Sequence, residues 1–187
     1  MFGGVNLGDT LVSTGKGRNY GLELTLQKFF TPDFYFLYSS SFFDAEYKPA
    51  DGNWYDSKYN LGYIHNLVGG KEFNWGKNKL IGLNLRFIWA GGKRFFPVDL
   101  EASREAGTVI LDMSKPFSEK GRDYLRLDLG VRFHIYGESA EHIFSLDIQN
   151  LTNRFNVMIE DYDPVSQDII EYPMTSLIPI FNYRLEF

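Results

Sequence analysis

Strict alternation of apolar and polar side chains in one long segment constrains this fold more than any other feature. In residues 122–136, apolar side chains occupy every second position from Leu125 to Ile135. A period of two places successive side chains on opposite faces of a β-strand. The segment therefore predicts a strand with one apolar and one polar face. The polar row is predicted to contain Arg126, Asp128, Arg132 and His134.

The same period recurs along most of the chain, which has 187 residues. No long window shows a helical period of 3.6 residues. The expected strands exceed the usual globular length of about 5–6 residues, and a tilted strand needs only about 9–11 residues to cross a bilayer. Seven strands are predicted, at about 17–30, 34–47, 56–68, 79–91, 122–136, 142–153 and 174–187.

Short connections alternate with longer ones. Residues 31–33 and 137–141 read as tight turns, whereas 92–121 and 154–173 are long. Outer-membrane barrels have this arrangement, with short periplasmic turns and longer external loops. The prediction puts Thr31, Gly70 and Ser139 on the periplasmic side and Asp51, Arg104 and Asp163 outside.

Composition narrows the class of protein. Aromatic residues make up 17% of the chain, and such residues favour pleated surfaces and interfaces that are part apolar and part wet. The absence of cysteine excludes disulfides and thiolate metal sites. A net charge of -5 argues against a nucleic-acid partner, which needs a basic face. No apolar run approaches the roughly 18 residues of a membrane helix.

Soluble β-sandwiches and lipocalin-like barrels also use alternating strands. Here the apolar phase holds large Leu, Phe and Trp side chains with few small ones, and the polar phase is uniformly polar. A wet lumen and a lipid-facing exterior suit that combination better than a tapered dry core.

Several segments together carry a resemblance to a known family. They are "GKGRNYGLELTL" at 15–26, "NLVGGKEF" at 66–73, "AGGKRFFPVDLEAS" at 90–103, "RLDLGVRF" at 126–133, "LDIQNLTNR" at 146–154 and "IPIFNYRLEF" at 178–187. In this order they resemble the carboxy-terminal part of the barrel of a TonB-dependent outer-membrane receptor of the Bacteroidetes type.

The resemblance implies an all-β fold, an antiparallel meander of about seven long strands that is part of a larger transmembrane β-barrel. Residues 1–187 would be its carboxy-terminal portion, without the plug and the remaining strands. Receptors of this kind have about 22 strands, and seven strands leave two open edges that hydrocarbon cannot satisfy. The expectation is therefore a fragment, from either a truncated reading frame or an excised piece.

The implied function is energy-coupled uptake of a nutrient, such as a metal chelate or a glycan, across the bacterial outer membrane. The implied partners are membrane lipid, the rest of the barrel and the plug, and the outer-membrane assembly machinery. The TonB complex would act only through the missing amino-terminal part. Within the last strand, the resemblance implies an assembly signal formed by Tyr183, Leu185 and Phe187.

Candidate ligand contacts lie in the two longest connections, because binding residues concentrate in loops. No catalytic, cofactor or metal constellation is expected, since His65, His134 and His142 lack ligand spacing. A small soluble or periplasmic β-rich binding module remains the alternative. The predicted external-loop contacts are Phe95, Phe96, Arg104, Asp161, Tyr162 and Asp163.

Overall fold

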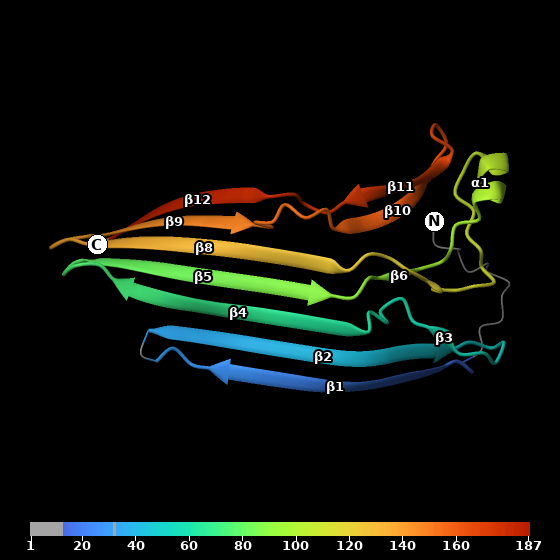
Figure 1. The fold of residues 1–187 in the computed structure, drawn as a ribbon, viewed down its shortest axis with the longest axis horizontal. Coiled ribbons are helices and arrows are strands. Elements are labelled where there is room, and N and C mark those ends of the chain that lie inside the picture. The colour runs from blue at the N-terminus through green and yellow to red at the C-terminus, as the bar shows by residue number, and fades with distance from the viewer. Residues whose placement is uncertain (1–12, 32) are drawn as a thin grey trace.

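The structure is a computed structural model that describes residues 13–31 and 33–187. Its main element is one large antiparallel sheet in which neighbouring strands follow one another along the chain (Figure 1). The predicted all-β meander is confirmed, and the sheet is not closed. Its long strands are β1 (Lys16–Lys28), β2 (Phe34–Lys48), β4 (Tyr63–Asn74), β5 (Lys79–Ala90), β8 (Tyr124–Tyr136), β9 (Glu141–Gln149) and β12 (Ile178–Glu186).

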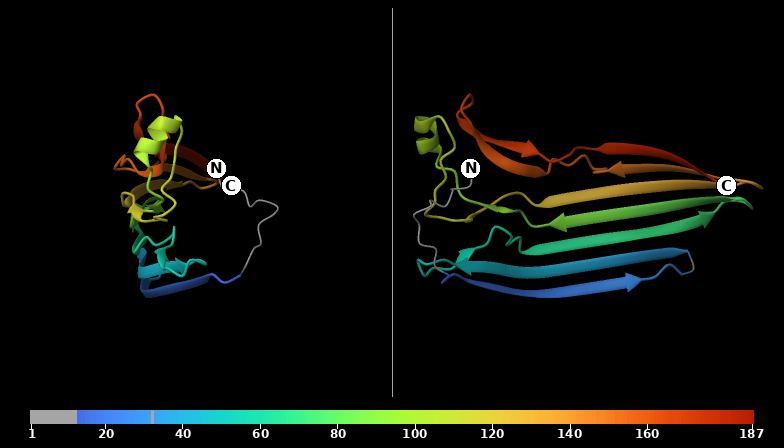
Figure 2. Two further views of the ribbon diagram at one scale, coloured as in Figure 1. Left: turned by 90° about the vertical axis from the view of Figure 1, so that its right-hand side faces the viewer. Right: turned by 180° about the vertical axis from the view of Figure 1, so that it is seen from behind.

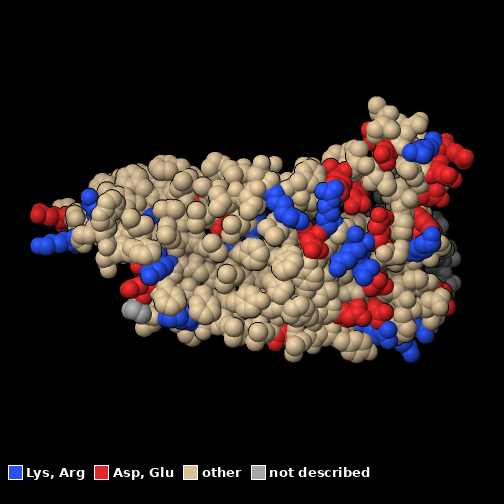
Figure 3. Space-filling model, viewed as in Figure 1, with Lys and Arg blue, Asp and Glu red and all other residues tan. Residues whose placement is uncertain are grey.

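The two ends of the sheet differ. Figure 1 shows the tight connections between long strands at one end and every longer connection at the other, which we call the loop end. Figure 2 shows the same separation from behind. On the face seen in Figure 3, charged side chains gather at the loop end, are sparse along the middle of the strands and reappear at the opposite end. The loop end holds β3 (Tyr55–Asp56), β6 (Arg94–Phe95), α1 (Leu100–Ala106), β7 (Glu119–Lys120), β10 (Val157–Asp163) and β11 (Asp168–Pro173).

The sheet is a single layer with very little dry core. In the described part of the chain, the buried hydrophobic residues are Ala90, Ile143 and Tyr162. The strand register aligns the apolar positions, so that Leu129 lies opposite Leu85 of β5 and Ile148 of β9. Along β1 and β12 every residue but the last of β1 is exposed. One face of the sheet, called the apolar face below, is therefore an open hydrophobic surface.

The two edge strands run in the same direction. Six antiparallel pairings separate β1 from β12, and an even number of reversals restores the original direction. Pairing β12 directly with β1 would be parallel, within one copy or between two copies that keep their apolar faces on the same side. Antiparallel closure of this sheet requires an odd number of further strands.

The third predicted strand was misplaced. It was expected at 56–68 and β4 occupies Tyr63–Asn74, so that Gly70 lies within a strand and not in a turn. Gly70 was expected in a periplasmic connection, yet a Cβ on Gly70 would lie 2.7 Å from the ring of Tyr35. The aromatic ring packs over the missing side chain and stabilises glycine in a strand. The chain bends earlier, at Gly62, whose φ is 84°.

The long connections contain regular structure that the sequence did not reveal. Residues 100–106 form α1, which begins at Asp99, whose carboxylate accepts from the backbone N–H of Ala102 at 3.0 Å, and ends at Gly107 with φ 65°. At two turns, this helix is too short to produce a detectable period. Residues 157–173 form a β10–β11 hairpin.

Two backbone segments pass close to Gly91 and Gly92 at the base of the loop end, and the absence of side chains permits it. A Cβ on Gly91 would lie 1.9 Å from the carbonyl oxygen of Leu61, and one on Gly92 would lie 1.8 Å from that of Gly121. Backbone atoms cannot move aside as a flexible side chain can. These glycines set how the loops leave the sheet.

We therefore predict that Gly91→Ala destabilises the protein by more than the roughly 1–3 kcal/mol typical of overpacking. Gly17→Ala is the matched control, because its Cβ would meet Glu46 at an ordinary 3.8 Å. That change should stay within about 1 kcal/mol. Urea unfolding of both variants measures the difference, and equal midpoints would contradict the close crossing.

Candidate functional site

The predicted polar row lies on one face of β8. Arg126 Nε donates to Asp128 Oδ1 at 2.7 Å, and His134 Nδ1 lies 2.5 Å from Glu141 Oε1 on β9. Arg132 is on the same face and exposed. The alternation thus brings all four side chains to one surface, called the polar face below. That this face borders a lumen stays a prediction.

The polar row continues across neighbouring strands. Asn84 of β5 and Asp147 of β9 lie on either side of Gly130. A Cβ on Gly130 would approach Asp147 Oδ1 to 2.6 Å, so the glycine leaves room for that carboxylate. Asn84 in turn accepts a hydrogen bond from the hydroxyl of Tyr35 at 3.0 Å. A continuous polar strip therefore runs from β2 to β9, suited to a hydrated wall and not to a dry core.

The long connections hold one another at the loop end. Arg104 Nε of α1 donates to the carbonyl oxygen of Gln167, in the turn of the β10–β11 hairpin, at 3.0 Å. Arg122 Nη2 lies 3.1 Å from Glu171 Oε2 on the same hairpin. These two arginines join segments that are distant in sequence. The loops form one assembly.

The predicted loop residues have different surroundings. Phe96 packs against Phe117 with 4.5 Å between ring centroids, and Phe95 lines a cavity. Asp163 accepts from the backbone N–H of Val165 at 3.1 Å and therefore shapes the hairpin turn. Asp161 accepts from the N–H of Tyr162 at 2.8 Å.

Tyr162 is only 6% exposed, which leaves it poorly placed to touch a ligand. Arg104 is exposed, but its Nε is already used by the contact to the hairpin. Among the six predicted contacts, Phe95 lies in the best position, because it lines the cavity described next.

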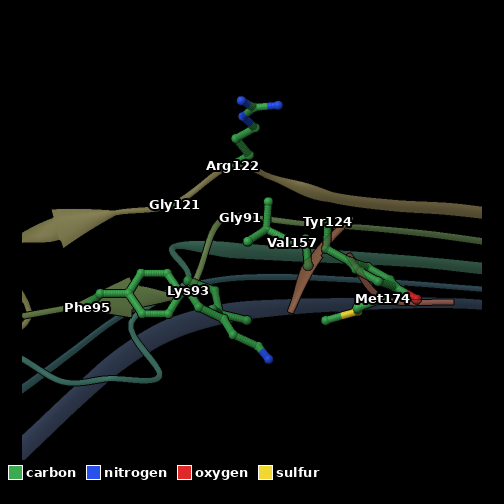
Figure 4. Close-up of a pocket in the computed structure, with 10 residues that line it drawn as sticks. Gly91, Lys93, Phe95, Gly121, Arg122, Tyr124, Val157 and Met174 are labelled. Carbon is green, nitrogen blue, oxygen red and sulfur yellow. The ribbon is translucent and has the colours of Figure 1, made fainter. Parts of the chain in front are cut away.

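That cavity, of about 350 Å³, lies where the loops meet the strand ends. Its lining is mainly apolar, and Figure 4 shows Arg122 directed away from Phe95, Val157 and Met174. A space of this size and character can take an apolar part of a small ligand. The lining residues are Leu61, Ala90, Gly91, Lys93, Phe95, Gly121, Arg122, Tyr124, Val157 and Met174.

Two buried asparagines, missed from the sequence, fasten the hairpin to the sheet. Asn156 is 4% exposed; its amide accepts from the backbone N–H of Leu125 at 3.0 Å and donates to the same residue's carbonyl oxygen at 2.9 Å. Its side chain thus pairs with the β8 backbone beyond the end of β9. Asn150 is 2% exposed, with φ 49°, and donates to the carbonyl oxygen of Arg154 at 3.0 Å. The sequence signal that could have indicated this role is the high density of asparagines in "NLTNRFN", because asparagine side chains often bond to nearby backbone in turns.

The residues of the implied assembly signal are accessible. Tyr183 and Leu185 lie on the apolar face of β12, where Tyr183 receives or gives a hydrogen bond at 2.8 Å to Nδ1 of His142. Phe187 follows the last strand residue and is 99% exposed. Recognition by an assembly machinery stays a prediction.

No known family, curated protein or solved structure matches this chain in the comparisons made. Within residues 13–31 and 33–187, no helix is both long and apolar enough to cross a membrane. The same residues contain no group of three or more His, Cys, Asp or Glu side chains placed to hold a metal ion.

The pKa values of two acids in the hairpin are shifted in opposite directions. Burial, together with the charges of Glu119 and Glu171, raises the pKa of Glu160, while Arg122 opposes this shift. Hydrogen bonds from the Ser166 hydroxyl and from nearby backbone N–H groups lower the pKa of Asp163. Folding therefore favours protonated Glu160 and ionised Asp163.

We predict that Glu160→Gln stabilises the hairpin at neutral pH, because the ionised side chain is disfavoured in the folded state. This gain should vanish as the pH falls below the unfolded pKa of about 4.3. Asp163→Asn, the matched variant, should destabilise the hairpin at neutral pH, and that loss should fade as the pH falls through the lowered folded pKa. Hydrogen exchange of the β10–β11 amides in the wild type and both variants, at neutral pH and below pH about 4.3, measures these changes. Equal protection of all three proteins at neutral pH would contradict the prediction.

Proposed function

We propose that this chain forms part of the wall of a larger transmembrane β-barrel in a bacterial outer membrane, serving TonB-dependent uptake of a nutrient. The observation that carries the proposal is a single-layer sheet with one open apolar face and a polar strip across the other face. In water, the apolar face would be exposed unfavourably. In a barrel that spans a lipid bilayer, the polar face borders a hydrated lumen and the apolar face contacts hydrocarbon. The receptor family and the energy coupling rest on the sequence resemblance.

The dimensions of the apolar face support a membrane setting. On β4, Tyr63 near the loop end and Phe73 near the turn end are ten positions apart, which is about 33 Å along a strand. At a tilt of about 40°, this span projects to about 25 Å, the height of the apolar band between the aromatic girdles of outer-membrane barrels. Trp89 packs against Tyr63 near the loop end, and Trp75 packs against Phe133 near the opposite end.

The open edges define the required partners. Unpaired backbone groups of β1 and β12 have no water to bind in hydrocarbon, so further strands must pair with them. An odd number of such strands closes the sheet with antiparallel pairing throughout. The proposed partners are these strands and a plug on the polar side, lipid on the apolar side, and the assembly machinery during insertion. The TonB complex would act through the other parts of the receptor.

The alternative is a small β-rich binding module that would bind its ligand in the cavity at the loop end. It would require the exposed apolar face to be tolerated in water. Large exposed apolar surfaces on soluble monomers mark interaction sites or aggregation hazards. Monodisperse behaviour of the protein without detergent would favour this module.

The two faces can be told apart by one matched pair of substitutions in the complete barrel. Leu146 and Ser145 are adjacent on β9 and lie on the apolar and polar faces respectively. Leu146→Arg should cost about 2–4 kcal/mol of folding free energy in lipid, and Ser145→Arg much less. Folding into vesicles under a urea gradient measures both. Equal costs would remove the case for a bilayer.

The orientation is testable because the chain has no cysteine. Val165, at the tip of the β10–β11 hairpin, is 91% exposed, and Glu138 is exposed in a turn at the opposite end. A membrane-impermeant maleimide added to intact cells should label Val165→Cys and leave Glu138→Cys unlabelled until the outer membrane is opened. The reverse pattern would invert the proposed orientation.

A further inference from the structure

A small polar cluster interrupts the apolar face near the loop end. His65 of β4 lies on this face between Leu67 and Tyr63. Its Nδ1 is 3.0 Å from the hydroxyl of Ser40 and 3.1 Å from that of Tyr38, both on β2. Ser40 is only 4% exposed. Three hydrogen-bonding side chains therefore meet where the proposed function expects lipid.

Aromatic rings enclose the cluster. Trp89 stacks beside the His65 imidazole at 5.4 Å between centroids, and Phe42 meets it edge-on at 5.3 Å. Tyr63 lies at 5.6 Å. Phe42 is 52% and Trp89 40% exposed, so the enclosure is open toward the surroundings of the face. The imidazole is held in place but not covered.

The hydroxyls on Nδ1 determine what the other ring nitrogen can do. The hydroxyls of Ser40 and Tyr38 each carry a proton to donate, and an apolar setting makes an unused donor costly. Nδ1 has one lone pair and accepts from one of these hydroxyls at a time, and the neutral imidazole then carries its proton on Nε2. No hydrogen bond among the described residues uses Nε2 of His65. The cluster therefore offers one free N–H donor at the membrane boundary.

A cation lies above this donor, toward the loop end. Lys120 Nζ is 5.8 Å from the ring of Tyr63, which itself neighbours His65. Lys120 is exposed and forms no ion pair within 4 Å in the described part of the chain. The acid beside it, Asp123, accepts hydrogen bonds on both oxygens, from Tyr63 at 2.5 Å and from the N–H of Gly92 at 3.2 Å. Both carboxylate oxygens of Asp123 thus already have hydrogen-bond partners.

We propose that His65 and Lys120 bind the phosphate of a membrane lipid whose acyl chains lie along the apolar face below. This inference rests on the proposed function, because it needs the apolar face to border a bilayer. A phosphate oxygen accepts both the Nε2–H of His65 and the ammonium of Lys120. Phe42 and Trp89 flank the first carbons of the lipid, as aromatic rings do at membrane boundaries.

The test measures lipid retention by the complete barrel, using native mass spectrometry after titration with phosphatidylglycerol. A diglucosyl diacylglycerol with the same acyl chains is the phosphate-free comparison. Wild-type protein should retain the phospholipid more strongly. His65→Phe and Lys120→Gln should each weaken it by about tenfold, the loss expected for one hydrogen bond to a charged group.

His142→Phe is the matched control, since His142 lies at the opposite end of the same face and already bonds Tyr183. His142→Phe should leave lipid retention unchanged. Lys120→Arg, which keeps the positive charge, should retain the phospholipid as the wild type does. Equal retention in wild type, His65→Phe and Lys120→Gln would overturn the lipid site while leaving the barrel wall intact. Displacement of the phospholipid by inorganic phosphate alone would also overturn it. A barrel that never enters vesicles would overturn both the lipid site and the proposed function.

Discussion

The pairing register between successive long strands is the constraint on which the rest of this structure depends. Each strand satisfies its backbone hydrogen bonds only through its two neighbours, and a shift of one residue would move its side chains to the opposite face. In β8, that register places Leu129 between Leu85 and Ile148, and Gly130 between Asn84 and Asp147. The separation of the two faces is thus a property of the whole sheet.

The same register determines where the loops can meet. The antiparallel meander returns every longer connection to one end, where β6, β7, α1 and the β10–β11 hairpin gather (Figure 1). Because Gly91 and Gly92 lack side chains, the loop bases cross within van der Waals contact. Asn156 then supplies side-chain hydrogen bonds where the main-chain ladder of β8 ends. The cavity beside Phe95 results from this crossing and is not encoded by any contiguous motif.

Polar side chains have different hydrogen-bond partners on the two faces. On the polar face, Arg126, Asp128 and their neighbours pair along and across strands, as expected where water can complete their hydration. On the apolar face, the hydroxyls of Ser40 and Tyr38 converge on His65 and are surrounded by rings. Both hydroxyls share Nδ1 of His65 as their acceptor, and Nε2 has no hydrogen-bond partner among the described residues. This asymmetry is what distinguishes His65 from His134, whose partner is the carboxylate of Glu141.

The sequence by itself determined the strands and the sorting of their faces, because a period of two is a local property that each strand carries independently. It correctly predicted the polar row of Arg126, Asp128, Arg132 and His134 on one face. It misplaced β4, since glycine has turn propensity and the packing of the Tyr35 ring, from another strand, over Gly70 is not visible in the local sequence. Only tertiary structure decided the burial of Tyr162, the roles of Asn150 and Asn156, the contact of His65 with Ser40 and the position of Lys120 beside Tyr63. Each depends on contacts between residues far apart in the chain, and no local pattern records which strands will be neighbours or at what register.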